Sequence, residues 1–273
     1  MPVTRFAPSP SGWLHAGHAR AAWEAHSAAA GGRFLIRMED IDSTRCRPEY
    51  EAAILEDLSW LGLEWSPPVW RQSERMAVYA EALGRLQALG VLYPCFCTRH
   101  DIASAGQAPQ GPEGPLYPGT CRRLTSGEIS EFTAAGRVFA LRLDTGKASA
   151  MAGPLSWLDL TSGLQRADPL ALGDVVLARK ETPCSYHLAV TIDDAAQEIS
   201  IVTRGVDLFP ATHVHRLLQA LLDLPVPVWN HHQLVCDTAG RRLAKRDDAR
   251  SLRSLRAEGL SPGDVRRLCG MAG

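Results

Sequence analysis

RFAPSPSGWLHAGH, residues 5–18, is the stretch of sequence from which the fold of this chain can be worked out. It completes a strand expected over residues 3–7, turns at a run of Pro and Ser, and begins an Ala-rich helix expected over residues 16–30. The first turn of a helix has unpaired backbone N–H groups and the positive end of the helix dipole, and both suit a triphosphate. His15 and His18 share one face of that turn, and Gly17 lets a planar base approach the backbone closely.

Spacing alone leaves three interpretations of the two histidines. They could contact nucleotide phosphates, they could be surface residues beside a helix cap, or they could be a pair of metal ligands.

The segments that follow predict an α/β fold in which helices cover a parallel sheet. Residues 33–39 alternate like a second strand, and helical patterns follow over residues 48–61 and 73–89. Gly62 and Gly90 end these two helices in the way that C-terminal glycines do. The order strand, helix, strand, helix, helix is the beginning of such a sheet.

The composition and the local pattern of the sequence change between residues 93 and 194, and this change predicts an inserted subdomain. Gly and Pro cluster there, and short strand-like runs occupy residues 137–143, 174–179 and 186–192. The expected division has three parts: a catalytic domain of residues 1–92 and 195–240, an insert of residues 93–194, and a loop with a short helical tail over residues 241–273.

Composition limits the classes of protein that fit. The chain has 273 residues, 45% of them hydrophobic, which is enough for a core in two or so compact units. No apolar run approaches the roughly 20 residues of a membrane span, and no signal-peptide core precedes the first strand. We therefore expect a cytoplasmic protein, monomeric and without a membrane partner.

The formal net charge of -1 hides a basic region late in the chain. Residues 239–267 contain nine Arg or Lys and four acids, so the chain could bind an anionic partner through this region. A helical face exposed to solvent would have the same composition. Within this region, the run Arg241-Arg242-Leu243-Ala244-Lys245-Arg246 is a basic loop that could also be a nonspecific nucleic-acid patch.

Seven cysteines are an odd number, too few for a disulfide-stapled fold of this size. Cys95 and Cys97 are two residues apart, and Cys121 follows across a loop rich in Gly and Pro, which is typical of a tetrahedral zinc site lacking one ligand. Spacing leaves the fourth ligand open between His100 and Tyr117, and three buried free thiols are the alternative. The other four cysteines have no partner spacing and are expected to pack as ordinary side chains: Cys46, Cys184, Cys236 and Cys269.

Two neighbouring acids, Asp193 and Asp194, could hold Mg²⁺, but such pairs more often cap helices or bind arginines. We expect no catalytic role for them.

Residues 5–18 as a whole closely resemble the HIGH region of the class I aminoacyl-tRNA synthetases, in the glutamyl branch. The resemblance implies a Rossmann-type nucleotide-binding domain with an inserted, zinc-bearing, acceptor-binding subdomain. His15, Gly17 and His18 would then bind ATP, which would arrive with Mg²⁺. The two histidines would stabilise the charge that develops when a carboxylate attacks the α-phosphorus.

Residues 241–246 resemble the KMSKS loop of the same family. By this resemblance Lys245 would hold the leaving pyrophosphate as a catalytic residue, and Arg242 would take the place of the first lysine in the ATP site. Ala244 replaces a serine and so removes a hydroxyl donor. Since Arg242 keeps the positive charge, we expect ATP activation to be retained.

An amino acid with two carboxylates and one ammonium group needs an arginine and an acid in its pocket. The residues that match the family's glutamate contacts are Arg5, Ala7, Ser9, Glu39, Tyr186 and Arg204. Each alone has an ordinary interpretation: Arg5 and Arg204 could cap carbonyls, and Glu39 could pair with Arg37 or Arg45.

The cysteine pattern resembles that of the short glutamyl-queuosine tRNA(Asp) synthetases, which implies a zinc ion on Cys95, Cys97, Tyr117 and Cys121. Full-length glutamyl synthetases continue beyond the KMSKS loop into a part that reads the anticodon, whereas this sequence ends at Gly273. The resemblance then implies activation of L-glutamate with ATP and its transfer to the queuosine base at the wobble position of tRNA(Asp). The anticodon arm of that tRNA would enter the active site.

Three other functions remain open at this point. The chain could be another HIGH-type adenylate-forming nucleotidyltransferase or a truncated ordinary glutamyl-tRNA synthetase. It could also be a catalytically silent, zinc-bearing RNA-binding protein, because Arg242 and Ala244 depart from the family pattern.

Overall fold

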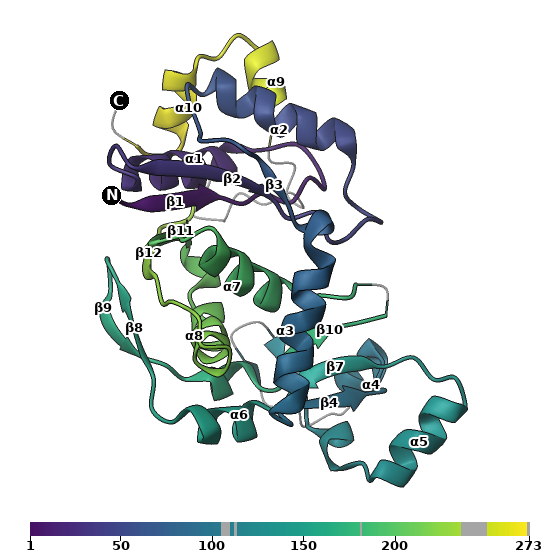
Figure 1. Ribbon diagram of the computed structural model, residues 1–273. Coiled ribbons are helices and arrows are strands. Elements are labelled where there is room, and N and C mark those ends of the chain that lie inside the picture. Colours follow the sequence, from purple (N-terminus) through teal and green to yellow (C-terminus); the bar gives the residue numbers. More distant parts are fainter. Residues whose placement is uncertain (105–109, 112–113, 181, 236–249, 272–273) are drawn as a thin grey trace.

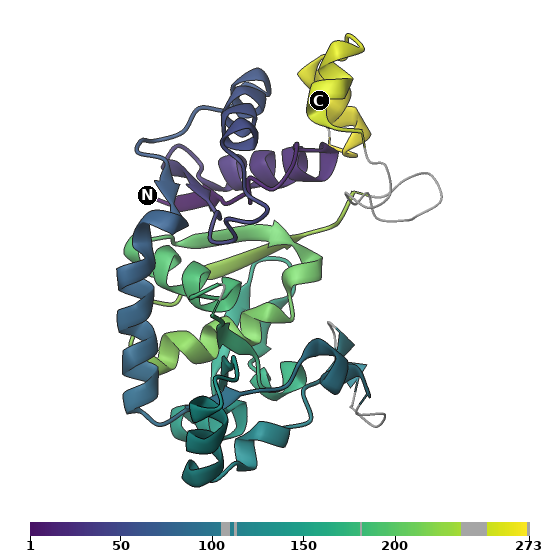
Figure 2. The same cartoon turned by 90° about the vertical axis from the view of Figure 1, so that its right-hand side faces the viewer.

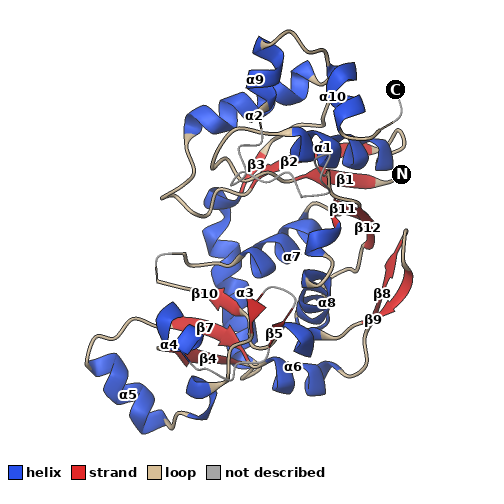
Figure 3. Cartoon of the chain, turned by 180° about the vertical axis from the view of Figure 1, so that it is seen from behind, coloured by secondary structure: helices blue, strands red, loops and turns tan. Residues whose placement is uncertain are grey.

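The structure is a computed structural model that describes residues 1–104, 110–111, 114–180, 182–235 and 250–271. Figure 1 shows a parallel sheet with helices at one end of the molecule and a smaller antiparallel sheet at the other, and Figure 2 shows the long helix α3 running between them. The N-terminus and helix α10 lie at the end of the molecule opposite to helix α5 (Figure 3).

The parallel sheet consists of two groups of strands that meet at β1. The first group has the order β1-β2-β3, and the second has the order β11-β12-β8, with β9 antiparallel at its edge. Ser200, just before β11, donates from its amide to the Val3 carbonyl at 2.9 Å and so joins the two groups. The strands are β1 (Val3–Phe6), β2 (Arg33–Met38), β3 (Trp70–Arg71), β8 (Ser156–Asp159), β9 (Gly163–Arg166), β11 (Ile201–Gly205) and β12 (Val228–His232).

Alternation along β2 separates the two faces of the sheet. Phe34, Ile36 and Met38 pack in the apolar cluster that includes α1 and α2, whereas Leu35 packs in a different cluster on the opposite face. Arg37 lies on the same face as Leu35, and α7 covers this face. The sheet therefore presents apolar side chains to one layer of helices and a buried charge to the other.

Seven helices of the described residues lie around this sheet, and the first three begin and end close to the expected positions. They are α1 (Ala16–Ala28), α2 (Pro48–Trp60), α3 (Met76–Ala88), α7 (Tyr186–Ala196), α8 (Ala211–Leu221), α9 (Leu252–Ala257) and α10 (Pro262–Leu268). Short 3-10 turns precede or join several elements: Gln72–Arg75, Thr120–Arg123, Pro169–Leu172 and Val206–Leu208. Leu252, Leu255 and Val265 of the last two helices pack in the same core as α1, which fixes the C-terminal region against the first helix.

The second sheet has the antiparallel order β10-β7-β4. Its strands and the neighbouring elements are β4 (Leu92–Cys95), α4 (Arg99–Ser104), the hairpin of β5 (Gln110–Gly111) and β6 (Gly114–Pro115), α5 (Ser126–Ala134), β7 (Ala140–Leu143), α6 (Thr145–Ala152) and β10 (Val176–Ala178). Leu143 and Leu177 of this sheet share a core with residues of α3, α7 and α8, so the two parts are packed together.

One expected strand is wrong. Residues 186–192 lie in the helix α7, where Ser185 caps the first turn through its side chain. Almost every residue of this run is buried, so hydrophobicity shows neither a period of two nor a period of 3.6, and the pattern could not separate strand from helix.

The expected domain boundary after residue 194 falls inside α7, and β8, within the expected insert, pairs with β12 in the parallel sheet. The division into domains stays a prediction. No helix in the described part of the chain is both long enough and apolar enough to span a lipid bilayer.

Candidate active site

The N-terminus of α1 is capped by the first histidine of the HAGH sequence. Nδ1 of His15 accepts a hydrogen bond from the Gly17 amide at 3.1 Å, and Nδ1 of His18 accepts one from the His15 amide at 3.1 Å. Because each Nδ1 is an acceptor, the proton of the neutral form of each ring is on Nε2. A Cβ on Gly17 would lie 2.9 Å from Cε1 of His15, so a larger residue would displace the capping ring.

The expected ATP contacts Arg242 and Lys245 lie outside the described residues. Val235, which precedes this segment, packs in the same apolar cluster as the start of α1. Ser251, which follows the segment, forms an antiparallel bridge with His15. Ser251, after the segment, therefore lies at the N-terminus of α1, and Val235, before it, packs in the same core as that helix.

Arg204, at the end of β11, is buried with only 5% of its surface exposed. Its Nε donates to Nε2 of His231 at 3.1 Å, Nη1 to the Tyr186 hydroxyl at 3.2 Å and to Nδ1 of His215 at 3.3 Å, and Nη2 to Oγ1 of Thr212 at 2.5 Å. A guanidinium group has five N–H donors, so one N–H on Nη2 has no acceptor within the described residues. None of these four partners is a carboxylate.

Burial keeps the histidines around Arg204 uncharged. Burial first, and then the charge of Arg204, lower the pKa of His187 and of His231 to about 4. The same two causes place the pKa of His215 well below its usual range. Asp159 orients one of these rings, because its Oδ2 accepts from Nδ1 of His231 at 2.7 Å and leaves Nε2 as the acceptor for Arg204. A buried cation surrounded by neutral groups favours an anionic ligand.

Arg5 lies under α7 beside a second buried arginine, Arg37. Both bind Asp194 of that helix, since Oδ1 of Asp194 is 2.8 Å from Nε of Arg5 and 2.8 Å from Nη2 of Arg37. The neighbouring acid, Asp193, is 2.7 Å from Nε of Arg75. The expectation that these two acids bind arginines is confirmed.

Glu39 follows β2 and lies 4.0 Å from Arg37. Burial raises the pKa of Glu39 to about 7, although the charges of Arg37 and Arg5 oppose that rise. The Glu39 amide donates to the Pro8 carbonyl at 2.9 Å, which holds the turn after β1 against the end of β2. Ala7 lies in this turn and contributes backbone rather than a polar side chain.

Tyr186 connects these groups electrostatically. Burial raises its pKa, while the charge of Arg204 lowers it, Glu39 raises it and Arg5 lowers it. The structure therefore brings four of the expected glutamate contacts within electrostatic range of one another: Arg5, Glu39, Tyr186 and Arg204.

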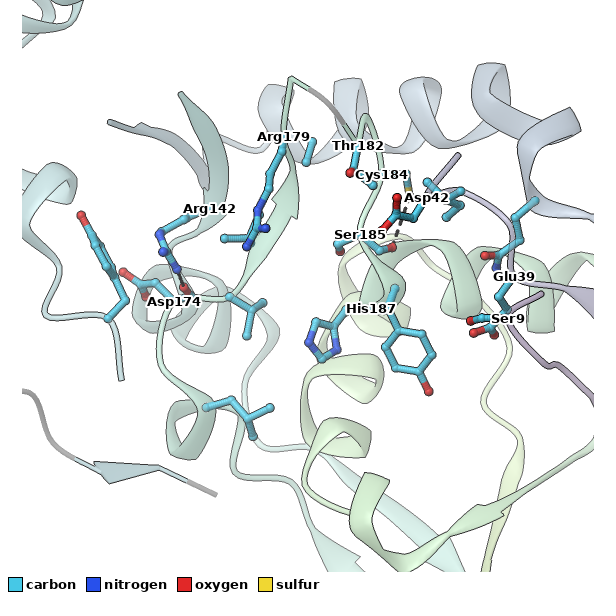
Figure 4. A pocket seen from close by; sticks show the side chains of 18 of the residues that line it. Ser9, Glu39, Asp42, Arg142, Asp174, Arg179, Thr182, Cys184, Ser185 and His187 are labelled. Carbon is cyan, nitrogen blue, oxygen red and sulfur yellow. Dashed lines mark hydrogen bonds between the residues drawn. The ribbon is translucent and has the colours of Figure 1, made fainter. Parts of the chain in front are cut away.

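One cavity of about 900 Å³ opens beside these residues. Ser9, Glu39 and Tyr186 line it, and it continues to Tyr117 and Arg142 of the insert. Figure 4 shows Ser9 and Glu39 at one end of the cavity, His187 between, and Arg142 with Asp174 at the other end.

The expected metal ligands also come together. The Sγ atoms of Cys95, Cys97 and Cys121 all lie within 4.8 Å of one another. Sγ of Cys97 is 3.5 Å from Sγ of Cys121 and 3.6 Å from the Tyr117 hydroxyl oxygen. Two thiolates on one tetrahedral zinc ion are about 3.8 Å apart, given Zn–S bonds of about 2.3 Å. Three sulfur atoms and one phenol oxygen at these separations fit such an ion, whereas the alternative ligand His100 is not part of this group of atoms.

Two neighbouring residues, Phe96 and Arg142, contact the ligand atoms of this cluster. The Phe96 amide donates to Sγ of Cys121 at 3.4 Å, as expected for a group that stabilises a thiolate. On the other side, the guanidinium carbon of Arg142 lies 3.9 Å from the ring centroid of Tyr117. The cluster is thus joined through Tyr117 to a residue that lines the cavity.

Sequence reasoning missed the groups that hold Arg204 in place. These are Asp159, Thr212, His215 and His231. They have no characteristic spacing in the sequence, and a single buried histidine is usually an ordinary core residue.

Comparison with known proteins identifies the family to which this chain is similar. The family described as tRNA synthetases class I (E and Q), catalytic domain, matches residues 2–273. A protein of Rhodobacter capsulatus named glutamyl-Q tRNA(Asp) synthetase is 51% identical over 282 residues, which cover 98% of this chain and 100% of that protein. A protein of the same name from Symbiobacterium thermophilum is 44% identical, and the match covers 96% of this chain and 83% of that protein.

Among solved structures, the glutamate tRNA ligase of Elizabethkingia meningosepticum in complex with its amino acid is similar, with a TM-score of 0.74 and 27% identity. The match covers 90% of this chain and 52% of the ligase, so the chain spans about half the length of that enzyme.

Proposed function

We infer the function from the premise that this chain belongs to the class I tRNA synthetases (E and Q), whose catalytic domain it matches over residues 2–273. We propose that it activates L-glutamate with ATP and transfers the glutamyl group to the queuosine base at the wobble position of tRNA(Asp). The names of the relatives support this acceptor, because proteins that are 51% and 44% identical are named glutamyl-Q tRNA(Asp) synthetases.

The buried guanidinium of Arg204 is the observation that carries the proposal. It lacks a carboxylate partner among the described residues, and it donates to the hydroxyl of Tyr186, which lines the cavity with Glu39. The side-chain carboxylate of glutamate would neutralise the charge of Arg204, and the ammonium group would face Glu39.

The reaction has two balanced steps. An oxygen of the glutamate α-carboxylate bonds to the α-phosphorus of ATP, and pyrophosphate leaves with the electron pair of the bond that breaks. A hydroxyl of the acceptor then attacks the carbonyl carbon of the mixed anhydride, loses its proton and releases AMP. Neither step needs a nucleophile from the protein, so positioning and charge stabilisation account for the catalysis.

We assign roles to the expected ATP residues on this basis. His15 and His18 would donate from Nε2 to phosphate oxygens beside the N-terminus of α1, and Gly17 keeps the cap geometry open. Lys245 and Arg242 would neutralise the pyrophosphate, and Mg²⁺ would enter with ATP. The position of Val235 and Ser251 near α1 supports this role for the segment between them.

The test of the function is charging of purified tRNA pools, with and without queuosine, using labelled glutamate. We expect label only in queuosine-containing tRNA(Asp), at a position removed from the 3′ end. Label at the 3′ end would identify an ordinary glutamyl synthetase activity, and a stable ligation product without tRNA would identify a small-molecule nucleotidyltransferase. RNA binding without any glutamate-dependent pyrophosphate exchange would identify a silent binding protein.

Glutamate binding should weaken in acid because of Glu39. An acid with a pKa of about 7 gains its proton as the pH falls through that value, and a protonated Glu39 cannot pair with the substrate ammonium group. The KM for glutamate in pyrophosphate exchange should be flat above pH 8. It should rise by up to about tenfold for each pH unit below 7.

The matched variant for this prediction is Glu39→Gln, which has no charge to lose. The KM of this variant for glutamate should be higher than that of wild type at pH 8. It should not rise further between pH 8 and pH 6, because residue 39 no longer titrates. A wild-type KM that stays constant over this range would show that Glu39 does not meet the ammonium group.

We propose that Cys95, Cys97, Tyr117 and Cys121 hold one structural zinc ion. Purified protein should contain about one zinc per chain, and Cys97→Ala should lose most of it, because three-ligand sites bind the ion far more weakly. Metal analysis of the purified variants measures this directly.

Two further variants separate the candidate fourth ligands. His100→Ala should keep its zinc, whereas Tyr117→Phe should release zinc to a chelator faster than wild type does. Cys46→Ser serves as the thiol control and should retain the full metal content. Loss of zinc from His100→Ala but not from Tyr117→Phe would reverse the assignment.

A further inference from the structure

The cavity extends well beyond the expected glutamate contacts. Ser9 and Glu39 lie at one end of its volume of about 900 Å³ (Figure 4), and His15, Gly17 and His18 are not among the described residues that line it. The far end is formed by the insert, where Arg142 and Asp174 face the same space as Arg179 (Figure 4). This far end therefore belongs neither to the amino acid nor to the N-terminus of α1.

Arg142 is a buried cation whose hydrogen-bond donors are only partly used by the described residues. It is 9% exposed, its Nη1 donates to the Asp174 carbonyl at 2.6 Å, and its plane covers the ring of Tyr117. Its Nε has no hydrogen-bond partner, and no ion pair joins Arg142 to a carboxylate within the described residues. A guanidinium held on an aromatic ring beside a cavity is suited to an anion with a planar or tetrahedral set of oxygens.

The charges around the cavity leave the far end positive. Six charged residues among the described ones line the cavity: Glu39, Asp42, Arg45, Arg142, Asp174 and Arg179. Asp42 is paired with Arg45 at 2.6 Å, and Asp174 is paired with Arg122 at 3.1 Å and accepts from the Tyr93 hydroxyl at 2.5 Å. After these pairs are formed, Arg142 and Arg179 are the cations of the far end that have no acidic partner among the described residues.

We propose that Arg142 and Arg179 form a subsite for the phosphodiester group next to the acceptor nucleotide. The proposal rests on the proposed function, because the second step must bring a nucleotide of an RNA chain to the glutamyl-adenylate. Leu116, Leu172 and Val176 also line the cavity, and Val176 is paired with Arg142 across the strands β10 and β7, so an apolar wall for a base or sugar is available beside that arginine. Anchoring the backbone at this end places the attached nucleotide between the insert and the glutamate pocket.

The experiment measures the two reaction steps separately in Arg142→Gln, Arg179→Ala and the double variant. Glutamate-dependent pyrophosphate exchange without tRNA reports the first step, and single-turnover transfer to queuosine-containing tRNA(Asp) reports the second. Exchange should stay within about twofold of wild type, while transfer should fall by about 10-fold to 100-fold for each lost charge-assisted contact. Arg123→Ala, an exposed arginine of the insert that does not line the cavity, is the control and should change neither step.

Salt dependence distinguishes a phosphate contact from a structural role. The dissociation constant of a queuosine-containing anticodon stem–loop should rise with salt, and the slope of its logarithm against log[salt] should fall by about 0.7 for each arginine removed. An unchanged slope, unchanged transfer, or a parallel loss of exchange and transfer would each overturn the subsite. Absence of exchange or transfer in the wild-type protein would instead contradict the proposed function itself.

Discussion

Replacing Arg204 by leucine is expected to remove glutamate-dependent pyrophosphate exchange, with kcat/KM for glutamate falling by about 10²-fold to 10⁴-fold. Two donors remain for a carboxylate at this position: the unpaired N–H on Nη2 of Arg204, and the hydroxyl proton of Tyr186, whose oxygen already accepts from Nη1. Hydrogen bonds to charged groups contribute about 1.5–3 kcal/mol each. Losing the cation also removes the orientation of the Tyr186 hydroxyl, so both contacts are lost together.

Arg204 should also determine which amino acid is accepted. Both available groups are donors, which suits the two oxygens of a carboxylate, whereas the amide of glutamine would turn an NH₂ group toward one of them. Wild-type protein should therefore discriminate strongly against glutamine. Arg204→Leu should lose most of that discrimination, since the residual activity of the variant would no longer depend on a charge in the side chain of the substrate.

The control for this variant is Arg216→Leu on the neighbouring helix α8. Arg216 donates to the Ser156 carbonyl at 3.0 Å and does not line the cavity. Its exchange activity should match that of wild type. A folded Arg204→Leu protein with a normal KM for glutamate would show that the substrate carboxylate binds elsewhere.

The hydrogen bonds that hold Arg204 in place explain why the sequence predicted this residue but not the side chains around it. Arg204 was expected from its match to a family motif, and the strand that contains it follows local propensity. Its four hydrogen-bond partners come from α7, α8 and β12, and their meeting depends on how these elements pack. Local periodicity contains no information on that packing, so His215 and His231 could not be distinguished from core histidines.

The start of the chain was predictable for the opposite reason. A strand, a proline-rich turn and a helix cap are all set by neighbouring residues, and His15 and His18 make their cap bonds within three positions of one another. The cysteine cluster is intermediate: the spacing identified the thiols and left the fourth ligand open, the family resemblance favoured Tyr117 over His100, and the fold places Tyr117 beside Cys97. Residues 186–192 mark the limit, because a run that is buried from Leu188 onward gives no clear periodicity from which to assign its structure.

Asp194→Asn is expected to lower the free energy of unfolding by about 3–5 kcal/mol, although the two side chains have nearly the same shape. Asp194 is the shared partner of two buried arginines, Arg5 and Arg37, and breaking a buried pair leaves an uncompensated charge. The amide would also direct an N–H group toward one guanidinium. For a chain of this size the melting temperature should fall by roughly 6–20 °C.

The pH dependence follows from the direction of the shift. The pKa of Asp194 is lowered in the folded protein, because the charges and hydrogen bonds of Arg5 and Arg37 outweigh the effect of burial. The stabilisation is therefore fully present above the unfolded pKa of about 3.9 and is lost as the pH falls through the folded value. The difference between wild type and Asp194→Asn should be constant from pH 5 to pH 8 and should decrease below about pH 4. Asp168→Asn, on an exposed acid, should show no comparable loss.

A second substitution separates lost charge from lost packing. If the cost of Asp194→Asn comes from two buried guanidiniums without a counterion, then adding Arg37→Met removes one of them and should restore part of the melting temperature. If the cost comes from packing alone, the double variant should be less stable than either single variant, because Arg37 is completely buried. Recovery would also support a role for Asp194 in holding Arg5, one of the residues proposed to contact glutamate, in place under α7.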